Sequence, residues 1–122
     1  MSTDGLDVSG SKVRVMGNTF SNFSDKGVSI GEISNVLIRD NIFYNNNMAI
    51  AVKDGSQSFI GKNRFQNNKV DISMYIKKKM YNKPSLHTIP SNKLLNFKIV
   101  KGDVFYYNNL NNLLNQLSLF FE

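Results

Sequence analysis

The stretch Asn18-Thr19-Phe20-Ser21-Asn22 returns twice, as Asn41-Ile42-Phe43-Tyr44-Asn45 and as Asn63-Arg64-Phe65-Gln66-Asn67. Each copy has the pattern Asn-x-Phe-x-Asn, and the copies start 23 residues (18 to 41) and then 22 residues (41 to 63) apart. A nearly fixed period of this length is typical of proteins built from stacked structural repeats. This stretch therefore decides the fold, and the rest of the chain can be placed around it.

Short alternating segments flank each copy. Those before the copies are Val13-Arg14-Val15, Val36-Leu37-Ile38 and Ser58-Phe59-Ile60. Those after them are Val28-Ser29-Ile30, Ile50-Ala51-Val52 and Ile72-Ser73-Met74, and Leu6-Asp7-Val8 has the same pattern one period earlier. Such segments indicate short β-strands, and turn residues such as Gly17 and Gly55 separate them.

A repeat this short, with several strands and no helical periodicity, cannot bury its apolar positions alone, so the repeats must stack. In a parallel β-helix each repeat forms one coil, and the strands of successive coils pair about 4.8 Å apart. The sequence therefore predicts an all-β parallel β-helix of about 3 to 5 coils with 22 or 23 residues per coil. Leucine-rich repeats are excluded because the second and third copies contain almost no leucine, and a propeller blade needs roughly 40 residues.

Stacking places like residues over like, which predicts continuous columns. Two internal columns are Phe20, Phe43, Phe65 and Val8, Ile30, Val52, Met74. Two outward columns are Asp7, Ser29, Ala51, Ser73 and Arg14, Leu37, Phe59. Asn18, Asn41 and Asn63 are predicted to form an asparagine ladder, because a column of identical amides pairs donors with acceptors that would otherwise be buried at a cost.

Three segments carry a resemblance to a known family: Asp4-Gly5-Leu6-Asp7-Val8-Ser9-Gly10-Ser11, Asn41-Ile42-Phe43-Tyr44-Asn45-Asn46 and Ile50-Ala51-Val52-Lys53-Asp54-Gly55-Ser56. They resemble the right-handed parallel β-helix repeat of the pectate-lyase-like superfamily. The stretch up to Lys83-Pro84 is similar to β-helical segments near the C-terminus of larger bacterial surface and envelope proteins. The resemblance implies a right-handed solenoid and a parent protein in the cell envelope or outside the cell. It does not fix an activity, since the superfamily holds lyases, hydrolases, epimerases, adhesins and binding modules.

The chain divides into residues 1–84, which hold the repeats, and residues 85–122, which we expect to form an irregular last coil and a helix. Pro84 and Pro90 bracket a segment expected to be a strand of that coil. Asp103-Val104-Phe105-Tyr106-Tyr107-Asn108 loosely echoes Asp40-Asn41-Ile42-Phe43-Tyr44-Asn45. The apolar residues Leu110, Leu113, Leu114, Leu117 and Phe121 recur on one helical face. We therefore predict a short amphipathic helix over residues 109–121 that caps the exposed strand edges at the end of the solenoid.

At the other end, Asp4-Gly5-Leu6 begins in mid-coil, as in a truncated solenoid. We expect a fragment of a larger β-helix, a face covered by another subunit, or an association-prone chain. Met1 is followed by Ser2, Thr3 and Asp4, so no secretion signal is expected there. No apolar stretch reaches the roughly 18 residues that a membrane span requires.

Composition narrows the chemistry. The 122 residues include no cysteine and one histidine, His87, which excludes a disulfide framework and a thiolate or multi-histidine metal site within one copy. The net charge is +6. Residues 74–122 contain 7 basic and 2 acidic side chains, so +5 of that charge lies in the C-terminal part.

Lys77, Lys78 and Lys79, with Tyr75 and Tyr81 nearby, form the densest basic and aromatic cluster. This combination binds anionic polysaccharides, teichoic-type polymers or nucleic acids. Lysines at the end of a sheet also oppose edge-to-edge association. We favour the role of the lysines in opposing edge-to-edge association. The three lysines and two tyrosines remain the candidate ligand-binding residues, and nucleic acid is the least favoured of the ligands.

A catalytic role is harder to support. In lyases of the resembled fold, acidic residues on a strand face bind calcium and an Arg or Lys abstracts a proton from the sugar. Here Asp7 is the one acidic residue of its column. Glu32 and Asp54 suit turns, where carboxylates accept bonds from backbone amides, and His87 suits a structural role.

The sequence does not identify a catalytic residue and predicts no metal site, and calcium enters only under the lyase alternative. The expected function is a structural or binding module that presents a strand face to carbohydrate or to a neighbouring domain. The alternative is a remnant of a lyase or epimerase acting on uronate-containing polysaccharide.

Overall fold

The structure is a computed structural model that describes residues 4–89 and 95–121. Its strands are β1 (Asp4–Ser9), β2 (Lys12–Met16), β3 (Thr19–Ser21), β4 (Lys26–Gly31), β5 (Asn35–Arg39), β6 (Ile42–Tyr44), β7 (Met48–Lys53), β8 (Gln57–Ile60), β9 (Arg64–Gln66), β10 (Val70–Tyr75), β11 (Ser85–Thr88), β12 (Phe97–Ile99) and β13 (Asp103–Tyr106). One helix, α1 (Leu110–Phe121), follows them.

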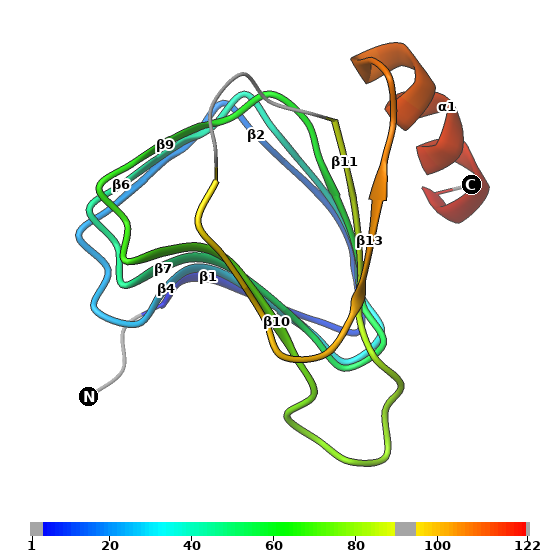
Figure 1. The fold of residues 1–122 in the computed structure, drawn as a ribbon, viewed down its shortest axis with the longest axis horizontal. Helices are drawn as coiled ribbons and strands as arrows, with labels where there is room; N and C mark the ends of the chain where they lie inside the picture. Colours follow the sequence, from blue (N-terminus) through cyan, green and yellow to red (C-terminus); the bar gives the residue numbers. More distant parts are fainter. Residues whose placement is uncertain (1–3, 90–94, 122) are drawn as a thin grey trace.

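The strands form the three walls of a solenoid with a roughly triangular cross-section (Figure 1). Sheet A has the order β1-β4-β7-β10-β12, sheet B the order β13-β11-β8-β5-β2, and sheet C the order β3-β6-β9. All pairs in the three sheets are parallel, for example β4 with β7 and β5 with β8. The predicted parallel β-helix is confirmed.

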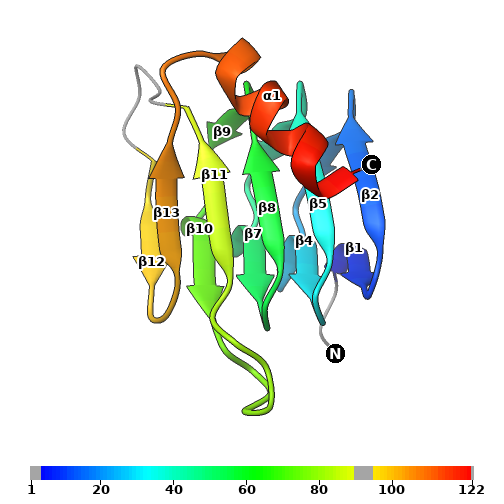
Figure 2. The same cartoon turned by 90° about the vertical axis from the view of Figure 1, so that its right-hand side faces the viewer.

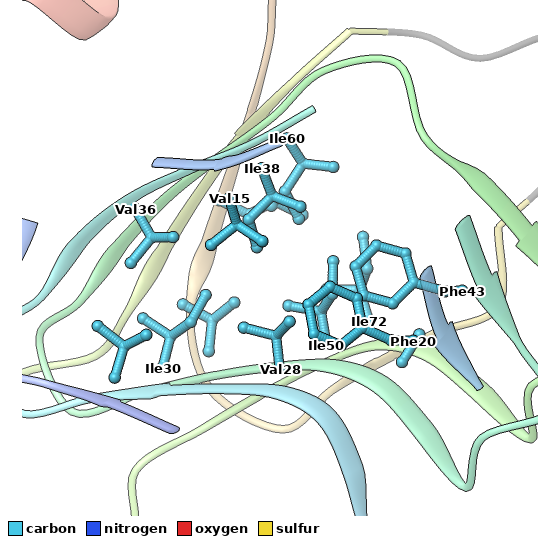
Figure 3. Close-up of a cluster of buried hydrophobic side chains, with 14 of the residues drawn as sticks. Val15, Phe20, Val28, Ile30, Val36, Ile38, Phe43, Ile50, Ile60 and Ile72 are labelled. Carbon is cyan, nitrogen blue, oxygen red and sulfur yellow. The ribbon is translucent and has the colours of Figure 1, made fainter. Parts of the chain in front are cut away.

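Register places the apolar residues over one another inside the three walls. Sheet A carries an internal column in which Val8 pairs with Ile30, Ile30 with Val52, and Val52 with Met74. Figure 3 shows side chains from the walls meeting in the interior, among them Val28, Ile38 and Phe43. Burial of this column of side chains is the main term that holds successive coils together.

The three phenylalanines of the repeated stretch lie in one stack within this core. The ring centroids of Phe20 and Phe43 are 5.2 Å apart and those of Phe43 and Phe65 are 5.1 Å apart, with interplanar angles of 12° and 8°. Phe43 is fully buried. Because Phe43 is the middle ring of the stack, its removal would take away packing contacts with both Phe20 and Phe65.

The first asparagines of the three copies lie at one corner and bond to one another from coil to coil. Asn18 Nδ2 donates to Asn41 Oδ1 at 3.3 Å, and Asn41 Nδ2 donates to Asn63 Oδ1 at 3.1 Å. Asn41 Nδ2 also donates to the carbonyl of Val15 at 2.8 Å. The ladder therefore adds side-chain hydrogen bonds to the backbone groups at this corner, such as the carbonyl of Val15 and the N–H of Asn18.

A second asparagine ladder was not predicted. Asn46 Nδ2 donates to Asn68 Oδ1 at 3.0 Å and to the carbonyl of Phe20 at 2.9 Å. The last asparagine of each repeated stretch has another role, since Asn22, Asn45 and Asn67 have φ of 64°, 59° and 56°. Asparagine tolerates this left-handed conformation better than most residues, so these three form the turn itself.

The predicted helix is present, but it covers a different surface from the one expected. Leu113 and Leu117 of α1 are buried against Leu37 and Phe59, which point outward from sheet B. Figure 2 shows α1 lying across the outer face of sheet B rather than over an end of the solenoid. The helix covers this face because Leu37 and Phe59, which pair on the neighbouring strands β5 and β8, present apolar side chains outward.

The loose similarity of residues 103–108 to residues 40–45 does not correspond to an equivalent position in the fold. It aligned residues 103–108 with the stretch that holds β6 of sheet C, whereas β13 pairs with β11 of sheet B. Phe105 accordingly stacks on His87 outside the core, at 5.0 Å. The segment before Pro90 forms strand β11, and Pro90 itself lies outside the described residues, as do Met1 to Thr3.

Candidate functional site

The outer face of sheet A carries a strip of small residues. Asp7 pairs with Ser29, Ser29 with Ala51, and Ala51 with Ser73. These four residues form the outward column that the repeat period predicts. Ser29, Ala51 and Ser73 point away from the core but are only 1%, 0% and 2% exposed. Longer side chains beside the strip must therefore lie over it.

Lys53 is one of those longer side chains. In its column Ser9 pairs with Gly31, and Lys53 in turn pairs with Tyr75. Lys53 follows Ala51 by two residues and so projects from the same face. A Cβ atom added to Gly31 would lie 3.4 Å from Lys53 Cε and 3.8 Å from Nζ. The lysine chain therefore lies over Gly31, within van der Waals range of the position that a Cβ atom would take.

The amine of Lys53 is unusual for a surface lysine. The residue is 8% exposed, and among residues 4–89 and 95–121 its Nζ makes no hydrogen bond or ion pair. Burial lowers the pKa of Lys53, and the positive charges of Lys77 and Lys26 lower it further against the opposing effect of Asp7. The lysine stem is largely covered while the amine still reaches solvent, so an anion can approach a cation that has no partner among the described residues.

Tyr75 lies beside Lys53 at the end of β10 and is half-buried. Burial raises the pKa of its hydroxyl, and Lys26 opposes that rise. Lys26 Nζ is itself paired with Asp25 Oδ2 at 3.0 Å. Lys26 is therefore already neutralised, whereas Lys53 and the Tyr75 ring remain available. We call Lys53, Tyr75 and the strip Ser29, Ala51 and Ser73 the sheet A face.

The loop of residues 76–84 projects from the corner between β10 and β11 (Figure 1). Asp54 Oδ1 accepts bonds from the backbone N–H of Lys77 at 2.8 Å and of Lys78 at 3.0 Å. The side chain of Lys78 is bound to Glu32, and Glu32 also accepts a bond from Ser9 Oγ at 2.8 Å. Asp54 thus has the expected turn role, while Glu32 holds a lysine of the loop.

The structure divides the five predicted ligand-binding residues. Tyr75 belongs to the sheet A face, and Lys77 is close enough to influence Lys53 electrostatically. Lys78 is occupied by Glu32, and Lys79 is exposed on the loop. Tyr81 lies on the other side of the loop, where it lines an open hollow of about 490 Å³ together with Ile76, Asn82 and Lys83.

Sequence reasoning missed Lys53. The signal was present, because the same outward column holds Gly31 one coil earlier and a lysine can lie over a glycine. No group of three or more His, Asp or Glu side chains that could hold a metal ion occurs among the described residues. The chemistry of the sheet A face is therefore that of a cation beside a phenol.

A family model for the right-handed β-helix region matches residues 1–116. The chain belongs to this family. Comparison with curated proteins and with solved structures finds no match. The family establishes the hand of this β-helix and leaves its ligand open. Across the described part of the chain, no helix combines the length and apolar character that crossing a bilayer would need.

His87 is the most enclosed ionisable group on sheet B of this right-handed β-helix. It is 5% exposed, and its ring stacks on Phe59 at 4.4 Å and on Phe105 at 5.0 Å. Nε2 is 2.6 Å from Gln57 Oε1 and Nδ1 is 2.8 Å from the hydroxyl of Tyr107. A neutral ring satisfies both bonds, with Nε2 donating to Gln57 and Nδ1 accepting from Tyr107. The histidine is packed and structural, and it has partners that the sequence did not reveal.

Acid should destabilise the β-helix through His87. Burial lowers the pKa of His87 from 6.5 to about 4. Between these values the unfolded chain binds a proton that the folded chain does not, so stability falls as the pH falls. The free energy of unfolding should drop by about 2 kcal/mol between pH 7 and pH 4.5 from this group alone.

Urea denaturation of the parent chain and of His87→Gln at the two pH values measures this drop. Carboxylate groups contribute equally to both chains, so the difference between their pH dependences isolates His87. An identical pH dependence of the two chains would show that His87 protonates freely in the folded state.

Proposed function

We propose that this right-handed β-helix is a binding module that takes an anionic polysaccharide on its sheet A face. The observation that carries the proposal is Lys53, an outward lysine whose stem is largely covered and whose amine reaches solvent with no partner among the described residues. A carboxylate or sulfate group of a polymer would supply the missing anion, and a weakly hydrated amine loses little on meeting it.

The rest of the face suits a sugar polymer. The strip of Ser29, Ala51 and Ser73 has no protruding side chain of its own, and a polymer would lie along the longer side chains that cover it, Lys53 among them. Tyr75 offers an aromatic surface with a hydroxyl at its rim, a combination enriched where proteins bind partners. The exposed Lys77 adds positive charge at one end of the face and would raise the rate of encounter with a polyanion. A role in a larger bacterial surface protein, as the repeat resemblance implies, would bring the module to such polymers.

Substitution of Lys53 tests the proposal. Binding of polygalacturonate or alginate to Lys53→Met, measured by calorimetry at low salt, should be about tenfold weaker than to the parent chain, since a charge-assisted bond is worth about 1.5 kcal/mol or more. Lys62→Met is the matched control, because Lys62 is an exposed lysine between β8 and β9 of other walls. It removes the same charge and should leave binding nearly unchanged.

Equal losses in Lys53→Met and Lys62→Met would mean that net charge alone attracts the polymer. Absence of binding to any acidic polysaccharide by the folded parent chain would refute the proposal. Binding of nucleic acid in preference to acidic polysaccharide would replace it.

The lowered pKa of Lys53 favours one alternative, a lyase or epimerase acting on uronate residues. A lowered pKa makes the neutral amine more accessible, and a neutral amine can accept the proton from the carbon next to the uronate carboxyl group, which begins both reactions. Elimination would release a 4,5-unsaturated sugar with a new ultraviolet absorbance. This alternative requires turnover by the parent chain and its loss in Lys53→Met, with and without added calcium.

A further inference from the structure

The two ends of the solenoid present strand edges. Among the described residues, β1 and β2 have a strand on one side only, and so do β12 and β13 at the other end. Apolar residues lie exposed at the second end, including Ile99 at 44%, Phe105 at 46% and Tyr106 at 59%. Unpaired edges of this kind are templates for pairing with another chain.

Register shows which charges stand at the ends of each outward column. On sheet A the column that begins with Asp7 ends with Lys98, because Ser73 pairs with Lys98. On sheet B the column that begins with Lys12 passes through Asn35, Gln57 and Ser85 and ends with Asp103. Each column thus has opposite charges at its two ends.

The internal columns also match end to end. The column of sheet A that begins with Val8 ends with Ile99. The column of sheet B that begins with Val13 ends with Val104. If the first coil of one copy followed the last coil of another in unbroken register, apolar residues would meet apolar residues inside, and opposite charges would meet outside.

We propose that copies of this chain associate head to tail, with β12 and β13 of one copy pairing in parallel with β1 and β2 of the next. Asp7 then lies opposite Lys98 of the neighbouring copy, and Lys12 lies opposite Asp103, whose carboxylate Lys83 of its own copy also contacts at 3.1 Å. Cross-strand pairs of opposite charge stabilise a sheet and fix its register. Because the contact joins two different surfaces and stacks copies along the solenoid axis, it continues into longer assemblies as concentration rises.

Helix α1 leaves both ends free for this contact. Figure 2 shows it lying across sheet B between β11 and β2, within the length of the solenoid. Phe121, near its end, has the guanidinium of Arg14 over its ring at 5.1 Å and Phe59 at its edge. The helix therefore protects the outer face of sheet B from association without covering the strand edges. An assembly built this way would extend the sheet A face across copies, but its formation does not depend on any polysaccharide.

Charge reversal at one end at a time tests the proposal by sedimentation velocity. The first variant, Asp7→Lys with Lys12→Glu, and the second, Lys98→Glu with Asp103→Lys, each place like charges across the contact. Each alone should associate on the order of tenfold more weakly than the parent chain. An equimolar mixture of the two variants should restore association, because every contact between unlike chains again joins opposite charges.

A parent chain that stays monomeric up to its solubility limit would overturn the proposal. Association of either variant as strong as that of the parent chain, or a mixture no stronger than its components, would also overturn it. Far-UV circular dichroism checks the fold of each variant. If one misfolds, the single substitutions Asp7→Lys and Lys98→Glu, mixed in the same way, decide the question.

Discussion

Replacement of Phe43 with alanine should lower the free energy of unfolding by about 4 kcal/mol, near the upper end for a single core residue. Phe43 is fully buried and lies between Phe20 and Phe65 at centroid distances of 5.2 and 5.1 Å. Its removal takes away apolar burial and two stacking partners at once, and leaves a cavity that stacked strands cannot collapse to fill. Urea denaturation followed by far-UV circular dichroism measures the loss.

Tyr44→Ala is the control for Phe43→Ala. Tyr44 is the next residue of the same strand, but it points outward and is 40% exposed. Its substitution should cost less than about 1 kcal/mol, as is usual for exposed side chains. Similar losses in the two variants would mean that β6 contributes as a strand and that the phenylalanine stack adds nothing.

Asn41→Ala should destabilise the protein by about 3 kcal/mol, because it breaks several buried hydrogen bonds. Asn41 is 2% exposed, and its side chain donates to the carbonyl of Val15 and to Asn63 Oδ1 and accepts from the backbone N–H of Asn18 at 2.9 Å. Alanine removes the side-chain donor to the carbonyl of Val15 and the side-chain acceptor of the Asn18 N–H. An unsatisfied buried group costs more than the net value of the bond it has lost.

Asn18→Ala provides the matched control in the same ladder. Asn18 is exposed, and its side chain donates to the carbonyl of Met16 at 3.0 Å. Water can replace what this substitution removes, so the expected loss is below about 1 kcal/mol. A loss for Asn41→Ala as small as that for Asn18→Ala would indicate that water enters the corner and satisfies Val15.

The repeat could be recognised in the sequence because stacking places equivalent residues one period apart. Phe43 and Asn41 could be assigned to separate columns from spacing alone. The second ladder, of Asn46 and Asn68, was hidden because Asn45 and Asn67 precede them, and composition cannot tell a ladder asparagine from one with positive φ. Spacing along the sequence assigns a residue to a column, whereas the backbone conformation decides whether an asparagine belongs to a ladder or to a turn.

Other features depended on contacts between distant segments. The apolar face of α1 was evident, but its partners Leu37 and Phe59 lie more than fifty residues earlier in the chain, so the covered surface could not be read from the helix. The two bonds of His87, to Gln57 and Tyr107, likewise join separate coils. Lys53 was not predicted because its side chain is notable for lying over Gly31 on the neighbouring strand, and this position is not part of any sequence motif.

The central claim is that the polymer binds on the sheet A face. NMR of the ¹⁵N-labelled protein, titrated with oligogalacturonate, tests this claim most directly through the backbone amide signals. The amides of Ser29, Ala51, Lys53, Ser73 and Tyr75 should shift together in the parent chain, and these shifts should be lost in Lys53→Met. Amides on the outer face of sheet B, such as those of Leu37 and Phe59, should not move. Shifts confined to residues 76–84, or spread evenly over all three walls, would contradict a binding site on sheet A.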